Sequence, residues 1–251
     1  MNQDFTGQVV LITGGGAGIG QAAALRFARA GARVVVTGRR EAPLRELAAR
    51  HDGIDWLVAD AGAPEDAART VAAVIERWGR LDVLVNNAGA GAILPLPDAD
   101  AARIRRIFDV NVVGPSLLAS AALPHLRATR GAIVNVSSTF GHKAGAMLSH
   151  YGASKAALEH MTRCWALELA ADGIRVNAIA AGPTETDFLA ERMGLSDQQI
   201  AAVKEQETRS IPLGRRGVPD DVAGMLVALA SRDGGWVTGQ VLAVDGGLNI
   251  A

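Results

Sequence analysis

The only tyrosine in this chain, Tyr151, lies four residues before Lys155 in the segment Tyr-Gly-Ala-Ser-Lys. Lysine is scarce too, since only three of the 25 lysine and arginine residues are lysines. Side chains at positions i and i+4 share one face of a helix, which would place the phenol beside the ammonium. A free phenol has a pKa of about 10, and a nearby positive charge lowers it because it stabilises the phenolate. The pair is therefore either an acid–base centre or a packed tyrosine beside a solvated lysine.

The bulk composition excludes several classes of function. A chain of 251 residues fits one α/β domain with a large core, and with 4% aromatic residues that core must be aliphatic. A net charge of −1 gives no basic surface for nucleic acid. The polar segment Met1–Gln8 lacks a signal-peptide pattern, and no apolar run reaches transmembrane length. The single Cys164 excludes an internal disulfide, and no cluster has metal-ligand spacing, so we expect a cytoplasmic protein without a metal.

Short β-branched segments alternate with longer helical segments along the chain. This pattern predicts a single-domain Rossmann-type α/β fold, a doubly wound parallel sheet of about seven strands with helices on both faces. The expected strands are Val9–Thr13, Arg33–Thr37, Asp55–Val58, Val83–Val85, Ala132–Val136, Arg175–Ala178 and Val241–Val244. The expected helices are Ile19–Ala30, Ala42–Arg50, Pro64–Trp78, Ala101–Arg127, Tyr151–Ala171 and Pro219–Ser231. The irregular segment 182–217, with a further helix at Ser196–Arg209, predicts a substrate lid over residues 184–213.

A glycine-rich turn follows the first expected strand. Five of the seven residues from Gly14 to Gly20 are glycines, and a helix follows. Glycines let the backbone approach a pyrophosphate closely, while the new helix presents free N–H groups and the positive end of its dipole. A ligand-free turn of this composition is the weaker interpretation. We therefore expect dinucleotide contacts from Gly14, Gly16, Gly18, Ile19 and Gly20.

The spacing of this turn resembles the short-chain dehydrogenase/reductase family. The resemblance continues from Thr13 to Gly247. Its motifs occur in the family's order: Asn86-Asn87-Ala88-Gly89, Asn111, Ser138, Tyr151-x3-Lys155 and Val244-Asp245-Gly246-Gly247. It implies an oxidoreductase that interconverts a ketone and a secondary alcohol by hydride transfer with a nicotinamide cofactor.

The resemblance implies four catalytic roles. Tyr151 would be the acid, or the base in the reverse direction. Lys155 would lower the pKa of the tyrosine and bind the nicotinamide ribose. Ser138, at the carboxyl edge of the sheet, would bind the substrate oxygen, and Asn111 would hold a water in a proton path that ends at Lys155.

The end of the second strand indicates which cofactor is used. NAD enzymes usually carry an acidic residue here, whereas this chain has Gly38 followed by Arg39 and Arg40. Glycine leaves room for a 2′-phosphate, and a guanidinium pairs well with it. We predict NADP(H), bound first by Arg39 and second by Arg40, with NAD(H) possible because Ala17 is not basic and Glu41 could reach a ribose.

Further cofactor contacts follow from the resemblance alone. Asp60 would contact the adenine amino group with Ala61 beside it, although a turn-capping role is almost as well supported. The adenosine side of the cleft would be lined by Asn87, Ala88 and Gly89. The nicotinamide loop would contribute Gly182, Pro183, Thr184 and Thr186, and it departs from the family where Ala181 replaces proline.

The substrate is the least determined feature. An apolar pocket favours a neutral ketone or secondary alcohol. Its lid side would be formed by Phe188, Leu189, Met193 and Leu195, and its opposite wall by Ala90, Met147 and Leu148. A 3-oxoacyl-[acyl-carrier-protein] reductase ranks second, since Arg127 and Arg130 could meet an acidic carrier but Asp172 replaces a basic residue. An NAD-dependent sugar or polyol dehydrogenase ranks third, and a non-catalytic dinucleotide-binding protein last.

Relatives of this kind usually form homotetramers or homodimers. The segments Ala156–Ala171 and Val241–Ala251 suit close packing between subunits. We therefore expect an oligomer that acts on a small molecule, with neither nucleic acid nor membrane as a partner.

Overall fold

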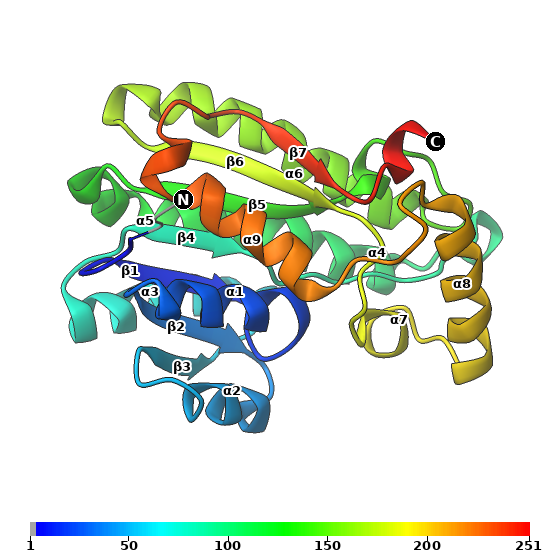
Figure 1. Ribbon diagram of the computed structural model, residues 1–251, viewed down its shortest axis with the longest axis horizontal. Coiled ribbons are helices and arrows are strands. Elements are labelled where there is room, and N and C mark those ends of the chain that lie inside the picture. The colour runs from blue at the N-terminus through cyan, green and yellow to red at the C-terminus, as the bar shows by residue number, and fades with distance from the viewer. Residues whose placement is uncertain (1–3) are drawn as a thin grey trace.

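The computed structural model describes residues 4–251, and its centre is a seven-stranded parallel sheet (Figure 1). The strand order is β3-β2-β1-β4-β5-β6-β7, which confirms the predicted fold class. The strands are β1 (Val9–Thr13), β2 (Arg33–Gly38), β3 (Ile54–Val58), β4 (Val83–Asn86), β5 (Ala132–Ser138), β6 (Arg175–Ala181) and β7 (Val241–Val244). The order reverses between β1 and β4, and a ligand-binding crevice is expected where the two halves of such a sheet diverge.

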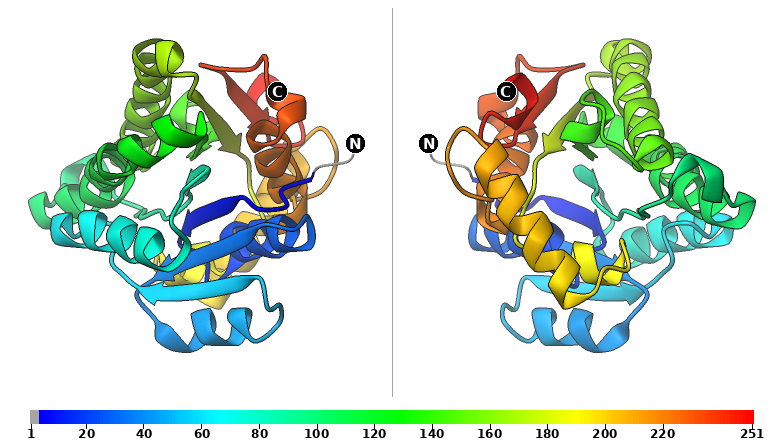
Figure 2. Two further views of the ribbon diagram at one scale, coloured as in Figure 1. Left: turned by 90° about the vertical axis from the view of Figure 1, so that its left-hand side faces the viewer. Right: turned by 90° about the vertical axis from the view of Figure 1, so that its right-hand side faces the viewer.

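Helices cover both faces of the sheet, as Figure 2 shows from the two ends. Helices α1, α2 and α9 pack on one face, and α3, α5 and α6 pack on the other. The helices are α1 (Gly18–Arg29), α2 (Glu41–Ala48), α3 (Pro64–Trp78), α4 (Ala101–Phe108), α5 (Gly114–Thr129), α6 (Ser149–Leu169), α7 (Phe188–Glu191), α8 (Asp197–Ser210) and α9 (Pro219–Ala230).

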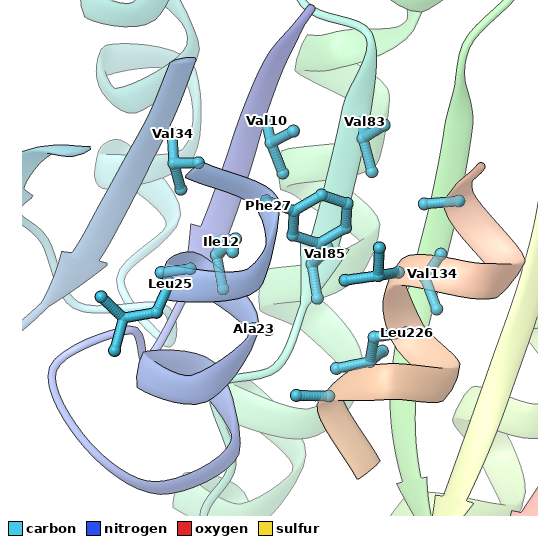
Figure 3. Packing of buried hydrophobic residues seen from close by; sticks show 14 of the residues in the cluster. Val10, Ile12, Ala23, Leu25, Phe27, Val34, Val83, Val85, Val134 and Leu226 are labelled. Atoms are coloured by element: carbon cyan, nitrogen blue, oxygen red, sulfur yellow. The ribbon is translucent and has the colours of Figure 1, made fainter. Parts of the chain in front are cut away.

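The core is aliphatic, and Figure 3 shows its packing on the α1 and α9 face. Val10 and Ile12 of β1 lie fully buried beneath Phe27 of α1, while Leu226 of α9 covers the neighbouring strands. Because helices cover both faces, the central strands are apolar on both sides rather than alternating. This rigid sheet holds the strand ends where the functional residues lie.

The expected helix Ala101–Arg127 is interrupted in the structure. Residues Asp109–Val113 form a π-helical turn between α4 and α5. Pro115 contributes to this break, since it has no N–H to donate to the carbonyl four residues earlier, that of Asn111. Such π turns occur frequently at functional sites, and here the turn carries Asn111.

The same stretch differs from the sequence-based expectation in another respect. By length and composition alone Ala101–Thr129 could span a membrane, and its most apolar window has a mean hydropathy of 1.4. In the structure α5 packs against α3 and the sheet, and core helices of globular proteins pass the same test. One face of α5 lies in this core, and 39% of the most apolar window is buried.

The segment predicted to be the lid, residues 184–213 and called the lid below, lies beyond the carboxyl ends of the strands (Figure 1). It contains the short helix α7, which the sequence pattern did not reveal because four residues are too few for a helical period, and α8, which begins at a capping box of Ser196 and Gln199. The buried Arg216, three residues after the lid, holds the start of the lid, because it donates to the carbonyl of Thr184 and pairs with Glu185.

Candidate active site

Tyr151, Lys155 and Ser138 meet at the carboxyl edge of the sheet. The tyrosine and the lysine lie on the first turns of α6, 8% and 3% exposed, and the lysine Nζ is 6.0 Å from the centre of the tyrosine ring. Strand β5 ends at Ser138 rather than at Val136 as expected, because Ser138 still pairs with Ala181 of β6. The serine is thus held by the sheet and the tyrosine by a helix, which gives a rigid arrangement.

The pKa of Tyr151 is shifted in the direction opposite to the one expected from its neighbour. Burial raises the pKa of Tyr151, and hydrogen bonding with Ser138 only partly offsets this. A phenolate loses its hydration in a buried site. The ammonium of Lys155 donates instead to the carbonyl of Val136 at 2.9 Å. The tyrosine is therefore a protonated phenol at neutral pH, suited to act as an acid.

Glu159, which sequence reasoning missed, supports the charge of Lys155. Burial lowers the pKa of Lys155 to about 8, and the negative charge of Glu159 acts in the opposite direction. The Glu159 side chain is 4% exposed and accepts a hydrogen bond from Ser137 at 2.7 Å, while Nδ1 of His142 lies 3.3 Å from its other oxygen. Its i, i+4 spacing from Lys155 was the available signal.

We predict that Lys155→Met stabilises the protein. The lysine pKa falls from 10.5 to about 8 on folding, so removing this cost, less one lost hydrogen bond, should raise the free energy of unfolding by about 2 kcal/mol at pH 7. Between pH 8 and 10.5 the unfolded lysine binds a proton that the folded one does not, so the stability of the wild type rises with pH and the gain shrinks.

Thermal unfolding from pH 7 to pH 11 checks this, with an expected Tm increase of roughly 4–8 °C at neutral pH. Lys143→Met is the matched control, since Lys143 is not among the buried residues and its ammonium binds the carbonyl of Ala251. An equal gain in both variants, or a loss in Lys155→Met, would contradict the burial cost.

We predict that Glu159→Gln shifts the pH profile of the enzyme. Without the carboxylate, the ammonium of Lys155 loses its proton more easily. The alkaline limb of kcat/KM for carbonyl reduction should then move down by up to about one pH unit. His142 and Lys155 are the titratable groups that act on Glu159 here, so His142→Gln serves as the comparison. A uniform loss of activity without a shift would indicate a purely structural role for the carboxylate.

Asn111 links three backbone segments near the site. Its amide group donates to the carbonyl of Ala90 at 2.8 Å and to the hydroxyl of Ser154 at 2.9 Å, and its carbonyl accepts from the N–H of Ala90. Ser154 donates in turn to the carbonyl of Tyr151. The side chain therefore braces the start of α6 against the segment after β4, while its role in a proton path stays a prediction.

An open cleft of about 430 Å³ runs along the carboxyl edge from Arg39 to Tyr151. Most of the predicted site residues line it, namely Gly14, Gly18, Ile19, Gly38, Arg39, Asp60, Ala61, Asn87, Ala88, Gly89, Ser138, Tyr151, Lys155, Gly182, Pro183, Thr184 and Thr186. Four predicted residues do not line the cleft: Gly16, Gly20, Arg40 and Asn111.

The glycine turn has the geometry that a dinucleotide needs. Gly14 and Gly18 have φ angles of 67° and 54°, in the left-handed region that favours glycine. A Cβ on Gly18 would lie 2.9 Å from Thr186 across the cleft. Gly16 faces α2 instead, and a Cβ on Gly20 would lie 2.4 Å from the carbonyl of Gly14, so these two glycines shape the turn rather than the cleft wall.

Asp60 is held as an acceptor beside the cleft. Arg106 donates to its carboxylate at 2.8 Å, and so does the N–H of Gly62 at 2.9 Å. Burial would raise the pKa of Asp60, but these hydrogen bonds outweigh it and lower the pKa. An ionised acceptor fits the amino group of adenine. Arg106 was not expected from the sequence, because only the fold brings α4 to this turn.

The two arginines after Gly38 point to different partners. Arg39 lines the cleft, whereas Arg40 pairs with Glu191 of α7 at 2.9 Å. The expected order of phosphate binding, Arg39 before Arg40, stays a prediction.

The lid lies against the catalytic end of the cleft. Phe188, Leu189 and Met193 line it, whereas Leu195, which was expected with them, does not. The ring of Phe188 lies 6.0 Å from that of Tyr151. On the opposite side Ala90 lines the cleft, but Met147 and Leu148 do not, and Met147 is 51% exposed. The expectation for these two residues was wrong, because the loop before α6 turns outward at Met147, whose φ is 64°.

The donor set of the cleft suits a nucleotide. Glycine backbone, a free arginine and buried hydroxyl groups line it, and over residues 4–251 no three His, Cys, Asp or Glu side chains gather as metal ligands do. A cleft that carries a glycine-rich turn at a helix N-terminus fits a dinucleotide phosphate.

Comparisons with known proteins cover the whole chain. A family model described as enoyl-(acyl carrier protein) reductase matches residues 14–249. The L-fucose dehydrogenase of Bos taurus is 36% identical over 251 residues, covering 100% of this chain and 92% of that protein.

Two solved structures share the fold over their full length. The 3-ketoacyl-(acyl-carrier-protein) reductase of Brucella melitensis complexed with NADH matches with a TM-score of 0.91 and 33% identity, covering 98% of this chain and 100% of that one. The RhlG/NADP active-site complex of Pseudomonas aeruginosa matches with a TM-score of 0.90 and 32% identity, covering 99% and 98%.

Proposed function

Because this chain belongs to the short-chain dehydrogenase/reductase family of NAD(P)-dependent oxidoreductases, we propose that it interconverts a neutral ketone and a secondary alcohol with NADP(H) as the preferred cofactor. One observation carries the proposal. A single cleft joins Tyr151 and Ser138 at one end to Gly38 and Arg39 at the other. A bound nicotinamide cofactor supplies the hydride, or accepts it in the reverse direction.

The residues of the chain supply the proton and the orientation. The hydroxyl of Ser138 binds the carbonyl oxygen of the substrate, and the phenol of Tyr151 gives its proton to the alkoxide that develops there. The raised pKa of Tyr151 keeps that proton in place until then, since an alkoxide is far more basic than a phenolate. The nearby ammonium of Lys155 stabilises the phenolate left after the transfer.

The preference for NADP(H) rests on this chain's own residues. The solved relatives carry NADH in one case and NADP in the other, so they do not decide the matter. Gly38 contributes no carboxylate to hold ribose hydroxyls, and Arg39 lines the cleft without a carboxylate partner among residues 4–251.

The apolar lid favours a neutral substrate over the other candidates. A 3-oxoacyl-[acyl-carrier-protein] reductase remains second, supported by the relative named 3-ketoacyl-(acyl-carrier-protein) reductase. Against it, Arg127 pairs with Asp172 at 2.7 Å and is less available to an acidic carrier. A sugar or polyol dehydrogenase is third, supported by the relative named L-fucose dehydrogenase but opposed by Phe188, Leu189 and Met193 in the cleft. A non-catalytic binding protein is last, since all the catalytic side chains are present.

The test is consumption of NADPH and of NADH against ketones, diketones, 3-oxoacyl thioesters and sugars, in both directions. Turnover with NADPH on a neutral ketone supports the proposal. Activity confined to sugars or to carrier-bound thioesters would replace the substrate class, and cofactor binding without turnover on any carbonyl or alcohol would favour the binding protein.

We also propose a homotetramer or homodimer in the cytoplasm. Each of the two segments expected at the subunit contacts has an exposed apolar side chain, Leu167 of α6 at 83% and Ile250 near the C-terminus at 89%. Burial between subunits would remove that exposed apolar surface from water. Light scattering that gives the single-chain mass of 26.0 kDa would refute the oligomer.

A further inference from the structure

Four arginines from separate elements gather at the adenosine end of the cleft. Arg39 and Arg40 follow β2, Arg106 lies on α4, and Arg192 follows α7 in the lid. Arg39, Arg106 and Arg192 line the same cleft. Arg40 lies beside this group, because it pairs with Glu191, the residue next to Arg192. Burial lowers the pKa of Arg192, the positive charges of Arg39, Arg40 and Arg106 lower it further, and Glu191 acts in the opposite direction.

Only two of these four positive charges have a carboxylate partner. Arg106 pairs with Asp60 at 2.8 Å and Arg40 with Glu191 at 2.9 Å. Over residues 4–251, Arg39 and Arg192 make no ion pair. The exposed guanidinium of Arg39 and the half-buried one of Arg192 repel each other, and an anion between them would relieve that repulsion.

We propose that Arg192 of the lid forms, together with Arg39, the site for the 2′-phosphate of the adenosine ribose, so that this phosphate draws the lid onto the cleft. The inference deepens the proposed NADP(H) preference and rests on it. Arg39 belongs to the rigid sheet edge, whereas Arg192 lies on the lid, four residues after Phe188, which lies over Tyr151. Binding of the 2′-phosphate would thus change the position of the lid beside Tyr151, at the substrate end of the cleft.

Glu191 should weaken binding of the 2′-phosphate, whereas Arg192 strengthens it. Its carboxylate neutralises Arg40 and adds a negative charge beside the phosphate position. Two neighbouring lid residues therefore carry opposite predictions. Loss of Arg192 weakens phosphate binding, while loss of the Glu191 charge strengthens it.

Calorimetric titration of the full chain tests the inference, with two probes that differ only in one group: adenosine 2′,5′-bisphosphate and adenosine 5′-phosphate. R192Q should weaken binding of the bisphosphate by about tenfold or more and leave the monophosphate within about twofold. E191Q should tighten the bisphosphate by about threefold. R209Q is the matched control, an exposed arginine of the same lid that pairs with Glu205, and should change neither probe.

Each outcome has a distinct meaning. If the wild type binds both probes equally, the NADP(H) preference and this inference both fail. If the wild type prefers the bisphosphate but R192Q keeps that preference, only the role of Arg192 fails. Equal weakening of both probes by R192Q would mean that Arg192 binds the 5′-phosphate side and would also overturn the inference.

Amide hydrogen exchange then measures whether the lid becomes more protected when the phosphate binds. The bisphosphate should slow exchange over residues 187–193 in the wild type, and it should do so less in R192Q. Equal slowing by both probes in the wild type would contradict the coupling of the lid to the 2′-phosphate.

Discussion

Tyr151→Phe should lower kcat for carbonyl reduction by about 10³-fold, the size expected for the loss of a general acid. Phenylalanine keeps the ring that packs beside Phe188 but has no proton to give to the alkoxide. The dissociation constant for NADPH should stay within about threefold of the wild type, because the substitution removes one hydroxyl group and keeps the ring that lines the cleft. Single-turnover rates and a separate binding titration measure the two effects.

The control for this variant is Ser138→Ala, which removes the group that orients the substrate oxygen. Both variants should lose kcat more than cofactor affinity, and the double variant should lose much less than the product of the two, since the residues act as a unit. If Tyr151→Phe kept more than about a tenth of the activity, another group would be the acid.

Gly38→Asp should reverse the cofactor preference, lowering the NADPH/NADH ratio of kcat/KM by about 100-fold. The added carboxylate would repel a 2′-phosphate and accept hydrogen bonds from the ribose hydroxyls of NADH. The structure has room for it, because a Cβ on Gly38 would make only ordinary contact with Leu44, at 3.4 Å. Steady-state kinetics with each cofactor measure the ratio.

Gly38→Asn separates charge from bulk, since it has almost the same shape without the negative charge. It should move the ratio far less, by about tenfold at most. An equal shift of the NADPH/NADH ratio in both variants would mean that steric exclusion sets the preference. If the ratio shifts in neither variant, no phosphate binds beside Gly38.

Much of this protein follows from patterns that are local in the sequence. The alternation of β-branched and helical segments predicted the seven strands. The run of glycines after the first strand predicted the turn between β1 and α1. The spacing of Tyr151 and Lys155 predicted their shared helix face. Such features depend on backbone periods of a few residues, and neighbours along the chain suffice to specify them.

The charge state and the outer parts of the site were decided only by the tertiary structure. Burial, not the neighbouring lysine, sets the direction of the Tyr151 pKa, and burial depends on α6 packing against strands far away in sequence. The π turn around Asn111 and the meeting of Arg106 and Arg192 at one end of the cleft likewise depend on elements that the fold brings together. Charge interactions and desolvation act through space, so their sum is known only once every neighbouring group is in place.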